Sequence, residues 1–162
     1  MVYECFQMFQ SEIFEVLDAL YYDEAIDGHK NANYTISSSG SVSTDATGTT
    51  VTIGTQYHSY RLMKDSDNRL TVTAPFVWEF DVLETTNMRV NIYQSDSVSK
   101  QINLNNTGHY KFIVADNKVT YSIDDGTPTE TTFNYTDVIQ LWIQSRNANA
   151  TSKFKNLKVY PI

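Results

Sequence analysis

The sequence predicts a mainly β protein: an antiparallel β-sandwich with a short N-terminal α-helix. Three observations indicate this fold. Beyond residue 33, apolar and polar residues alternate over short runs, as they do in strands that bury one face. Turn-forming pairs, among them Thr107-Gly108 and Asp116-Asn117, separate these runs. Residues 1–20 instead carry apolar residues at helical spacing and contain neither proline nor glycine.

The predicted helix has a seam of apolar residues spaced alternately by four and three positions, as in a heptad repeat: Val2, Phe6, Phe9, Ile13, Val16 and Leu20. A helix this apolar is unstable alone in water and has to bury its seam. It can do so on its own β domain, on copies of itself, or on another protein. We therefore expect residues 1–20 to be a helical assembly or docking segment and residues 21–162 to be the β domain.

Charge also sets the N-terminal segment apart. The net charge is −7, and residues 1–28 hold seven acidic residues with no lysine or arginine, so the remainder of the chain is neutral. An acidic chain repels phosphate backbones, and we expect no nucleic-acid partner. The uncompensated acids also leave open that the segment docks on a basic surface of another protein.

The first runs of the β domain are short and rich in serine, threonine and β-branched residues, which favour strands. Turn signals at Ser39-Gly40 and Thr47-Gly48 separate them, and the polar stretch 65–68 is typical of a hairpin turn. The expected strands are Tyr34–Ile36, Ser41–Thr44, Thr50–Ile53, Ser59–Met63 and Arg69–Thr73.

The later runs alternate over longer stretches and hold larger apolar residues. Alternation assigns Trp78, Phe80 and Val82 to the core and their neighbours to the outer face. The pair Asp116-Asn117 between two runs predicts a tight hairpin. The expected strands are Phe76–Leu83, Arg89–Tyr93, Lys100–Asn103, His109–Val114, Lys118–Ile123, Glu130–Asn134, Val138–Ser145 and Ser152–Tyr160.

The closing part of the sequence resembles a known fold family. Within GHYKFIVADNKVTYSIDDG and the residues after it, three pieces are similar to the last strands of a concanavalin A-like (laminin-G-like) jelly roll: Lys118–Gly126, Ile139–Ile143 and Lys153–Tyr160. The strand and polar loop that begin at Tyr21 are similar to the opening of the same fold, so the resemblance covers about residues 20–162. It implies the fold, which hosts lectins, hydrolases and structural modules alike.

A domain of this kind behind a short N-terminal helix also resembles modules of tailed-virus tail fibres and capsid-surface proteins. This resemblance implies a structural or receptor-binding role in a virion or cell-surface assembly, and a location on the virion or extracellular surface. It further implies partner proteins of that assembly attached through residues 1–20, and a homo-oligomer, with a trimer as the first expectation.

Alternation places one polar and aromatic set on the outer surface: Glu79, Asp81, Arg89, Asn91, Tyr93, Gln140, Trp142 and Gln144. Aromatic rings stack on the apolar face of a sugar, while amides, carboxylates and guanidinium groups pair with its hydroxyls. We therefore predict a glycan-binding surface over Trp142 and Tyr93. In the alternative interpretation, Trp142 covers a seam between the sheets or contacts the N-terminal helix.

The stretch EFDVLE, Glu79–Glu84, resembles the E-x-D-x-x-E signature of retaining β-glucanases of the laminarinase and lichenase group. The resemblance implies Glu79 as nucleophile, Asp81 as the residue that orients it, and Glu84 as acid/base. A regular strand, however, points residues five positions apart to opposite faces. Catalysis would require a β-bulge after Asp81, and nothing in FDVLETT demands one. We expect a non-catalytic module; the alternatives are a free-standing carbohydrate-binding module and, third, a retaining β-glucanase.

Other chemistry is sparse. Cys5 is the single cysteine, so no internal disulfide can form. His29, His58 and His109 lack the spacing of zinc ligands, and we expect neither metal nor cofactor. No apolar run approaches the roughly 18 residues of a membrane span, and the N-terminus has no basic region of the kind that opens a signal peptide. We therefore expect no membrane partner.

Overall fold

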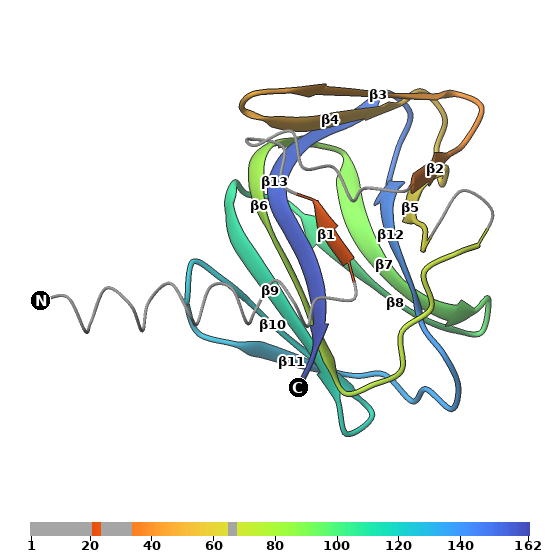
Figure 1. Cartoon of the computed structure of the whole chain (residues 1–162), viewed down its shortest axis with the longest axis vertical. Helices are drawn as coiled ribbons and strands as arrows, with labels where there is room; N and C mark the ends of the chain where they lie inside the picture. Colours follow the sequence, from red (N-terminus) through yellow and green to blue (C-terminus); the bar gives the residue numbers. More distant parts are fainter. Residues whose placement is uncertain (1–20, 24–33, 65–67) are drawn as a thin grey trace, which may run out of the picture.

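The computed structural model describes residues 21–23, 34–64 and 68–162. The predicted helix of residues 1–20 lies outside these described residues. The described chain forms two antiparallel sheets that lie as two layers, with β6, β9 and β13 in one layer and β5, β7 and β12 in the other (Figure 1). This arrangement confirms the predicted antiparallel β-sandwich.

The large sheet has the strand order β11-β10-β9-β6-β13-β4-β3, and β1 pairs with β13. Its strands are β1 (Tyr21–Asp23), β3 (Gly40–Asp45), β4 (Gly48–Ile53), β6 (Phe76–Thr86), β9 (Gly108–Ala115), β10 (Lys118–Ile123), β11 (Thr129–Thr132) and β13 (Ala150–Pro161). The small sheet has the order β2-β5-β12-β7-β8. Its strands are β2 (Tyr34–Ile36), β5 (Ser59–Leu62), β7 (Met88–Ser95), β8 (Val98–Leu104) and β12 (Gln140–Ser145).

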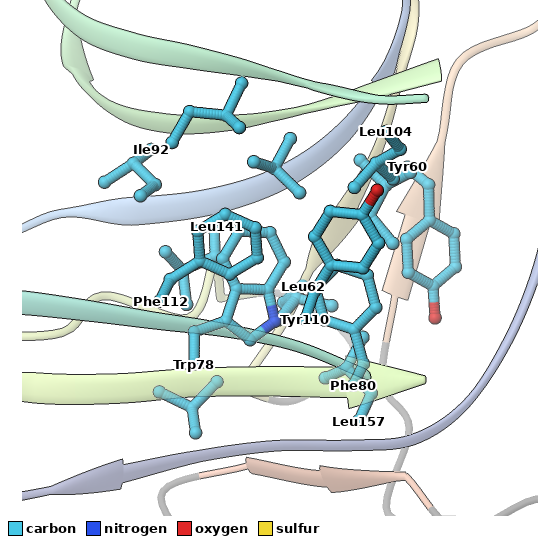
Figure 2. Close-up of a cluster of buried hydrophobic side chains, with 14 of the residues drawn as sticks. Tyr60, Leu62, Trp78, Phe80, Ile92, Leu104, Tyr110, Phe112, Leu141 and Leu157 are labelled. Carbon is cyan, nitrogen blue, oxygen red and sulfur yellow. The ribbon is translucent and has the colours of Figure 1, made fainter. Parts of the chain in front are cut away.

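The core between the sheets is dominated by aromatic side chains. Trp78 and Phe80 of β6 lie beside Tyr110 and Phe112 of β9, and all four are fully buried (Figure 2). The ring centroids of Trp78 and Phe80 are 5.2 Å apart, and those of Phe80 and Phe112 are 5.9 Å apart. The predicted inward face of β6 is therefore confirmed.

The predicted hairpin at Asp116-Asn117 is confirmed. Ala115 pairs with Lys118, and the two turn residues have φ of 50° and 56°. Aspartate and asparagine enter this left-handed region more readily than other residues that carry a side chain. The pair therefore joins β9 to β10 with a two-residue turn.

The expected strand Arg69–Thr73 is not a strand in the structure. Arg69 forms an isolated bridge with Met63, and Val72 forms another with Ile139. Because the segment changes its partner within three residues, no continuous ladder forms. Leu70 and Val72 are nevertheless buried, with 5% and 1% of their surface exposed. The alternation in this segment thus reflects burial and not strand pairing.

Candidate functional site

The structure divides the predicted binding surface between the two outer faces of the sandwich. Glu79 and Asp81 belong to β6 in the large sheet. The others belong to β7 and β12 in the small sheet: Arg89, Asn91, Tyr93, Gln140, Trp142 and Gln144. The prediction of one continuous surface is therefore wrong, because alternation separates inward from outward residues but does not say to which sheet a strand belongs.

On the small sheet, strand register brings the predicted residues together. Trp142 of β12 lies opposite Asn91 of β7, Gln144 lies opposite Arg89, and Gln140 lies opposite Tyr93. All of these residues except Gln140 line a pocket of about 400 Å³. The pocket is lined by Tyr57, Arg89, Asn91, Tyr93, Asp96, Ser99, Gln101, Trp142 and Gln144. We refer to it as the small-sheet pocket.

Trp142 is not the exposed aromatic plate that the sequence predicts. Only 8% of its surface is exposed. The ring of Tyr93 stacks on it with centroids 4.1 Å apart and an interplanar angle of 22°. The guanidinium carbon of Arg61 lies 4.4 Å from the Trp142 ring centroid. Since β5 and β7 flank β12 on opposite sides, these two groups cover opposite faces of the indole, and Trp142 supports Tyr93 instead of meeting a sugar face directly.

Tyr57 is the exposed aromatic residue of the pocket, and it is not among the residues that the sequence predicted for the site. Its side chain lies in the loop between β4 and β5 and is 59% exposed. Its φ of 63° lies in the left-handed region. Two backbone contacts hold this conformation: the Tyr57 N–H donates to the Ser145 carbonyl at 3.2 Å, and its carbonyl accepts from Gln144 Nε2 at 3.0 Å. A tyrosine inside a short loop was the only signal in the sequence.

Two polar atoms of pocket residues find no hydrogen-bond partner within the described part of the chain. They are Oδ1 of Asn91 and Nε1 of Trp142, and both are shielded from solvent. The exposed fractions of the two residues are 3% and 8%. Leaving a buried polar group unpaired costs about 1–3 kcal/mol, so such groups point to a ligand or an ordered water. One atom is an acceptor and the other a donor.

The two glutamines of β12 hold arginine side chains in place. Arg89 Nε donates to Gln144 Oε1 at 2.9 Å, and Arg69 Nη1 donates to Gln140 Oε1 at 3.3 Å. Burial lowers the pKa of Arg89, as expected for a guanidinium group that is partly removed from water. The Arg89 guanidinium also lies 5.3 Å from the Tyr57 ring centroid. The Gln144 amide thus positions Arg89 in the pocket lining, and the Gln140 amide positions Arg69 outside it.

Tyr93, at the end of the pocket away from Tyr57, acts as a hydrogen-bond donor. Its hydroxyl donates to Asp96 Oδ1 at 3.1 Å. Burial raises the pKa of Tyr93, and the bond to Asp96 raises it further. Because the ordinary pKa of tyrosine is already about 10, the hydroxyl stays protonated at neutral pH.

On the large sheet, Glu79 lies within a network of cations. Only 5% of the residue is exposed. Lys158 Nζ lies 2.8 Å from Glu79 Oε1, and the Tyr160 hydroxyl donates to Oε2 at 3.0 Å. Lys111 Nζ is 3.9 Å from the same Oε2. Both carboxylate oxygens are therefore engaged by neighbouring strands.

Asp81 is held just as firmly. Its Oδ1 is 2.7 Å from Nδ1 of His109, and its Oδ2 accepts from Asn156 Nδ2 at 2.7 Å. Asn156 has φ of 54° and lies where β13 has one residue more than its partner strand, since Lys155 pairs with Asp81 but Lys158 pairs with Glu79. An asparagine tolerates this bulge conformation and also supplies the amide that orients Asp81.

Glu84 lies on the same face as Glu79 and Asp81, contrary to the strand parity expected from the sequence. Lys153 of β13 pairs with Glu84, but the next residue, Phe154, pairs with Val82. Leu83 is therefore an extra residue in β6. Such a bulge shifts the alternation by one position, so the three acids of EFDVLE point to one side. The expectation that no bulge occurs after Asp81 is wrong.

Comparison with known proteins identifies the fold but no family. No protein-family model and no curated protein matches the sequence. Three solved structures resemble the chain: a sialidase, a Bacillus subtilis protein of unknown function with a galectin-like fold, and the Bacillus licheniformis β-glucanase. Their TM-scores are 0.60, 0.57 and 0.53, with 10%, 9% and 11% sequence identity.

The extent of these matches differs. The alignment with the sialidase covers 89% of this chain and 19% of the sialidase. The alignments with the Bacillus subtilis protein and the glucanase each cover 88% of this chain, and they cover 95% and 97% of those two proteins, respectively. The chain thus corresponds to about a fifth of the length of the sialidase. At such low identity the likeness concerns the fold alone, and it confirms the predicted concanavalin A-like jelly roll. In the described part of the chain, no helix is long and apolar enough to cross a membrane.

Proposed function

We propose that the chain is a non-catalytic, glycan-binding β-sandwich module and that the small-sheet pocket is its binding site. The observation that carries this proposal is the pair of unpartnered atoms, Asn91 Oδ1 and Trp142 Nε1, in residues that line the pocket. Saccharide hydroxyls both donate and accept, so neighbouring hydroxyls suit the acceptor and the donor together. Because both atoms are shielded from solvent, binding includes a small rearrangement of the side chains around them.

The aromatic residues of the pocket support the same proposal. Tyr57 has an exposed ring, and hydrogen bonds hold its backbone in place. Tyr93 is partly exposed, and its ring stacks on that of Trp142. Rings held in this way meet the apolar face of a sugar with little loss of conformational entropy. Amide and hydroxyl groups between them, from Gln101, Ser99 and Asn91, supply hydrogen bonds.

Replacement of Tyr57 by alanine is expected to weaken glycan binding about tenfold, because a stacked aromatic ring contributes about 0.5–1.5 kcal/mol beyond its area and about 1.4 kcal/mol is tenfold in affinity. Affinity gel electrophoresis against a panel of plant, algal and bacterial polysaccharides measures this. Tyr34→Ala is the matched control, since Tyr34 is 40% exposed but does not line the pocket. Equal binding by wild type and Tyr57→Ala would place the site elsewhere.

A retaining glycosidase is the second candidate function, and the bulge at Leu83 favours it by placing the three acids on one face. The state of Glu79 opposes it. A retaining enzyme needs a nucleophile that reaches the sugar, with the two carboxyl groups about 5–5.5 Å apart. Both Glu79 oxygens are instead bound by Lys158 and Tyr160 in a side chain that is 7% exposed. An ion-paired structural role fits this geometry better.

We therefore expect no hydrolysis of mixed-linkage or β-1,3-glucans by the full chain, as measured by release of reducing sugar. Glu79→Gln is the control, because it removes the charge that a nucleophile needs while it keeps the shape of the side chain. Hydrolysis by the wild type that disappears in Glu79→Gln would show that the large-sheet face is catalytic. Hydrolysis that persists unchanged in the variant would indicate a contaminating enzyme.

We also propose that the module belongs to a virion or cell-surface assembly, to which residues 1–20 attach it as a homo-oligomer, a trimer in the first instance. The heptad spacing of the apolar residues and the excess of acids in residues 1–28 support this proposal. The segment lies outside the described residues. A basic partner surface that binds residues 1–20 is the alternative mode of attachment.

A further inference from the structure

The arginines of the sequence are gathered on the small sheet. Arg61 belongs to β5 and Arg89 to β7, while Arg69 and Arg146 follow β5 and β12 and bond to Gln140 and Asn105. Lysines form the ion pairs of the large sheet, for example with Glu79 and Glu130. The two outer faces therefore differ in charge: the large-sheet face pairs cations with carboxylates, and the small-sheet face presents guanidinium groups.

Each of these guanidinium groups donates to a neutral oxygen. Arg61 Nε donates to Ser59 Oγ at 2.9 Å, and Arg89 Nε donates to Gln144 Oε1 at 2.9 Å. Arg69 donates to Gln140 at 3.3 Å and Arg146 donates to Asn105 at 3.0 Å. Such bonds fix the direction of a guanidinium group but leave its charge uncompensated.

The arginines of this face have no acidic partner among the residues that the structure describes. Among residues 34–64 and 68–162, no ion pair includes an arginine. Asp96 is the one carboxylate that lines the pocket, and it accepts from the Tyr93 hydroxyl. Burial lowers the pKa of Arg61 and of Arg89, and the neighbouring Arg69 and Arg146 lower them further. A nearby anion favours the charged form of a partly buried cation that lies beside another cation.

Positive charge lies near both ends of the pocket, although Arg89 is the only one of the four arginines that lines it. Arg61 and Arg69 lie near Tyr93 and Gln140 at one end, and Arg89 and Arg146 lie towards Tyr57 and Gln144 at the other. Gln140 and Gln144 are four residues apart on β12, which corresponds to about 13 Å along a strand. An extended chain that carries a negative charge at intervals would meet a guanidinium group at both ends and a tyrosine ring beside each.

We propose that the small-sheet pocket takes an acidic polysaccharide whose sugar units carry carboxylate groups. The guanidinium groups bind the carboxylates, in the fork geometry that suits arginine, and the tyrosines and amides bind the sugar rings and hydroxyls. This inference rests on the proposed glycan-binding function and adds the chemical class of the ligand to it.

A matched pair of ligands tests the inference. Immobilised polygalacturonate and its fully methyl-esterified form share one sugar backbone and differ in their carboxylate charge. The full chain is expected to bind the free acid at least tenfold more tightly, and the difference should shrink as salt is raised, since partly exposed ion pairs are screened. Equal binding to both forms would overturn this inference while leaving glycan binding intact. Binding to no polysaccharide of the larger panel would instead overturn the proposed function itself.

Substitutions in the protein show which cationic side chains bind the carboxylates. Arg89→Gln is expected to lose about tenfold in affinity for polygalacturonate and little for the esterified form, and Arg89→Lys should recover part of the loss. Arg89 is partly buried and bonds to Gln144 at 2.9 Å, whereas Arg69 is exposed and bonds to Gln140 at 3.3 Å. Arg69→Gln therefore serves as a second variant, with a severalfold loss expected. Lys118→Gln removes the same charge from the large sheet, where Lys118 pairs with Glu130, and should leave binding unchanged.

Two results would count against the carboxylate inference. One is an equal loss in Lys118→Gln and Arg89→Gln, which would mean that only the net charge of the protein matters. The other is equally tight binding of a single-stranded oligonucleotide, which would mean that the face selects phosphate or any polyanion. Circular dichroism of each variant, matched to the wild type, separates lost contacts from lost folding.

Discussion

Phe80→Ala is expected to lower the free energy of unfolding by about 3–5 kcal/mol, the usual cost of removing a buried aromatic ring. Phe80 is fully buried in β6, and its ring lies against those of Trp78, Tyr110, Phe112 and Phe154, at centroid distances between 5.2 and 6.3 Å. Alanine would leave a cavity that these rings cannot fill without leaving their own rotamers. The loss is a large part of the 5–15 kcal/mol by which a domain is typically stable.

Urea denaturation followed by tryptophan fluorescence measures this effect as a shift of the midpoint at constant slope. Tyr57→Ala is the control, since its ring is 59% exposed and its removal should change the free energy of unfolding by less than about 1 kcal/mol. The same control shows that any loss of glycan binding in Tyr57→Ala is not a loss of folding. A Phe80→Ala protein as stable as the wild type would contradict the described core.

Glu79→Ala is expected to lower the free energy of unfolding by about 3 kcal/mol, near the lower end of the cost of breaking a buried ion pair. The Glu79 side chain is 7% exposed, and its removal takes a carboxylate away from Lys158, Tyr160 and Lys111. The cost stays at the lower end because Lys158 and Lys111 keep 23% and 39% of their side chains exposed and regain some hydration.

Glu130→Ala is the matched control for this effect. Glu130 pairs with Lys118 at 2.8 Å, but the two side chains are 56% and 49% exposed. Exposed pairs of this kind contribute about 0–1 kcal/mol, and salt screens them. We expect the destabilisation by Glu79→Ala to persist in 1 M salt, whereas that by Glu130→Ala should be small and vanish. Equal effects of the two variants would show that Glu79 lies in no buried network.

Patterns among residues that are neighbours in the sequence were sufficient to predict much of the fold. The alternation in β6 correctly assigned Trp78 and Phe80 to the core, and Asp116-Asn117 correctly predicted a tight hairpin. Both features depend on residues that are neighbours in the chain. Side-chain direction in a strand alternates with a period of two, and the left-handed turn depends on two adjacent residues that tolerate it.

The candidate site depends on contacts that no local pattern contains. The faces of the Trp142 indole are covered by Arg61 of β5 and Tyr93 of β7. These residues lie about 80 and about 50 positions before Trp142 in the chain. Tyr57 became the exposed ring because Gln144 and Ser145 of β12 hold its loop. Neither neighbour can be identified from the residues that flank Trp142 or Tyr57.

The face on which Glu84 lies was also decided by a distant strand. In FDVLETT nothing marks Leu83 as an extra residue. In the pairing of β6 with β13, however, no residue of β13 lies opposite Leu83, and Glu84 therefore points to the same side as Glu79 and Asp81. The sequence by itself thus determined the class of fold, the inward faces and the tight turns. Sheet membership, register and the division of charge between two outer faces were decided by the tertiary structure, because strand pairing joins residues far apart in the chain, and a shift of one position reverses every side chain beyond it.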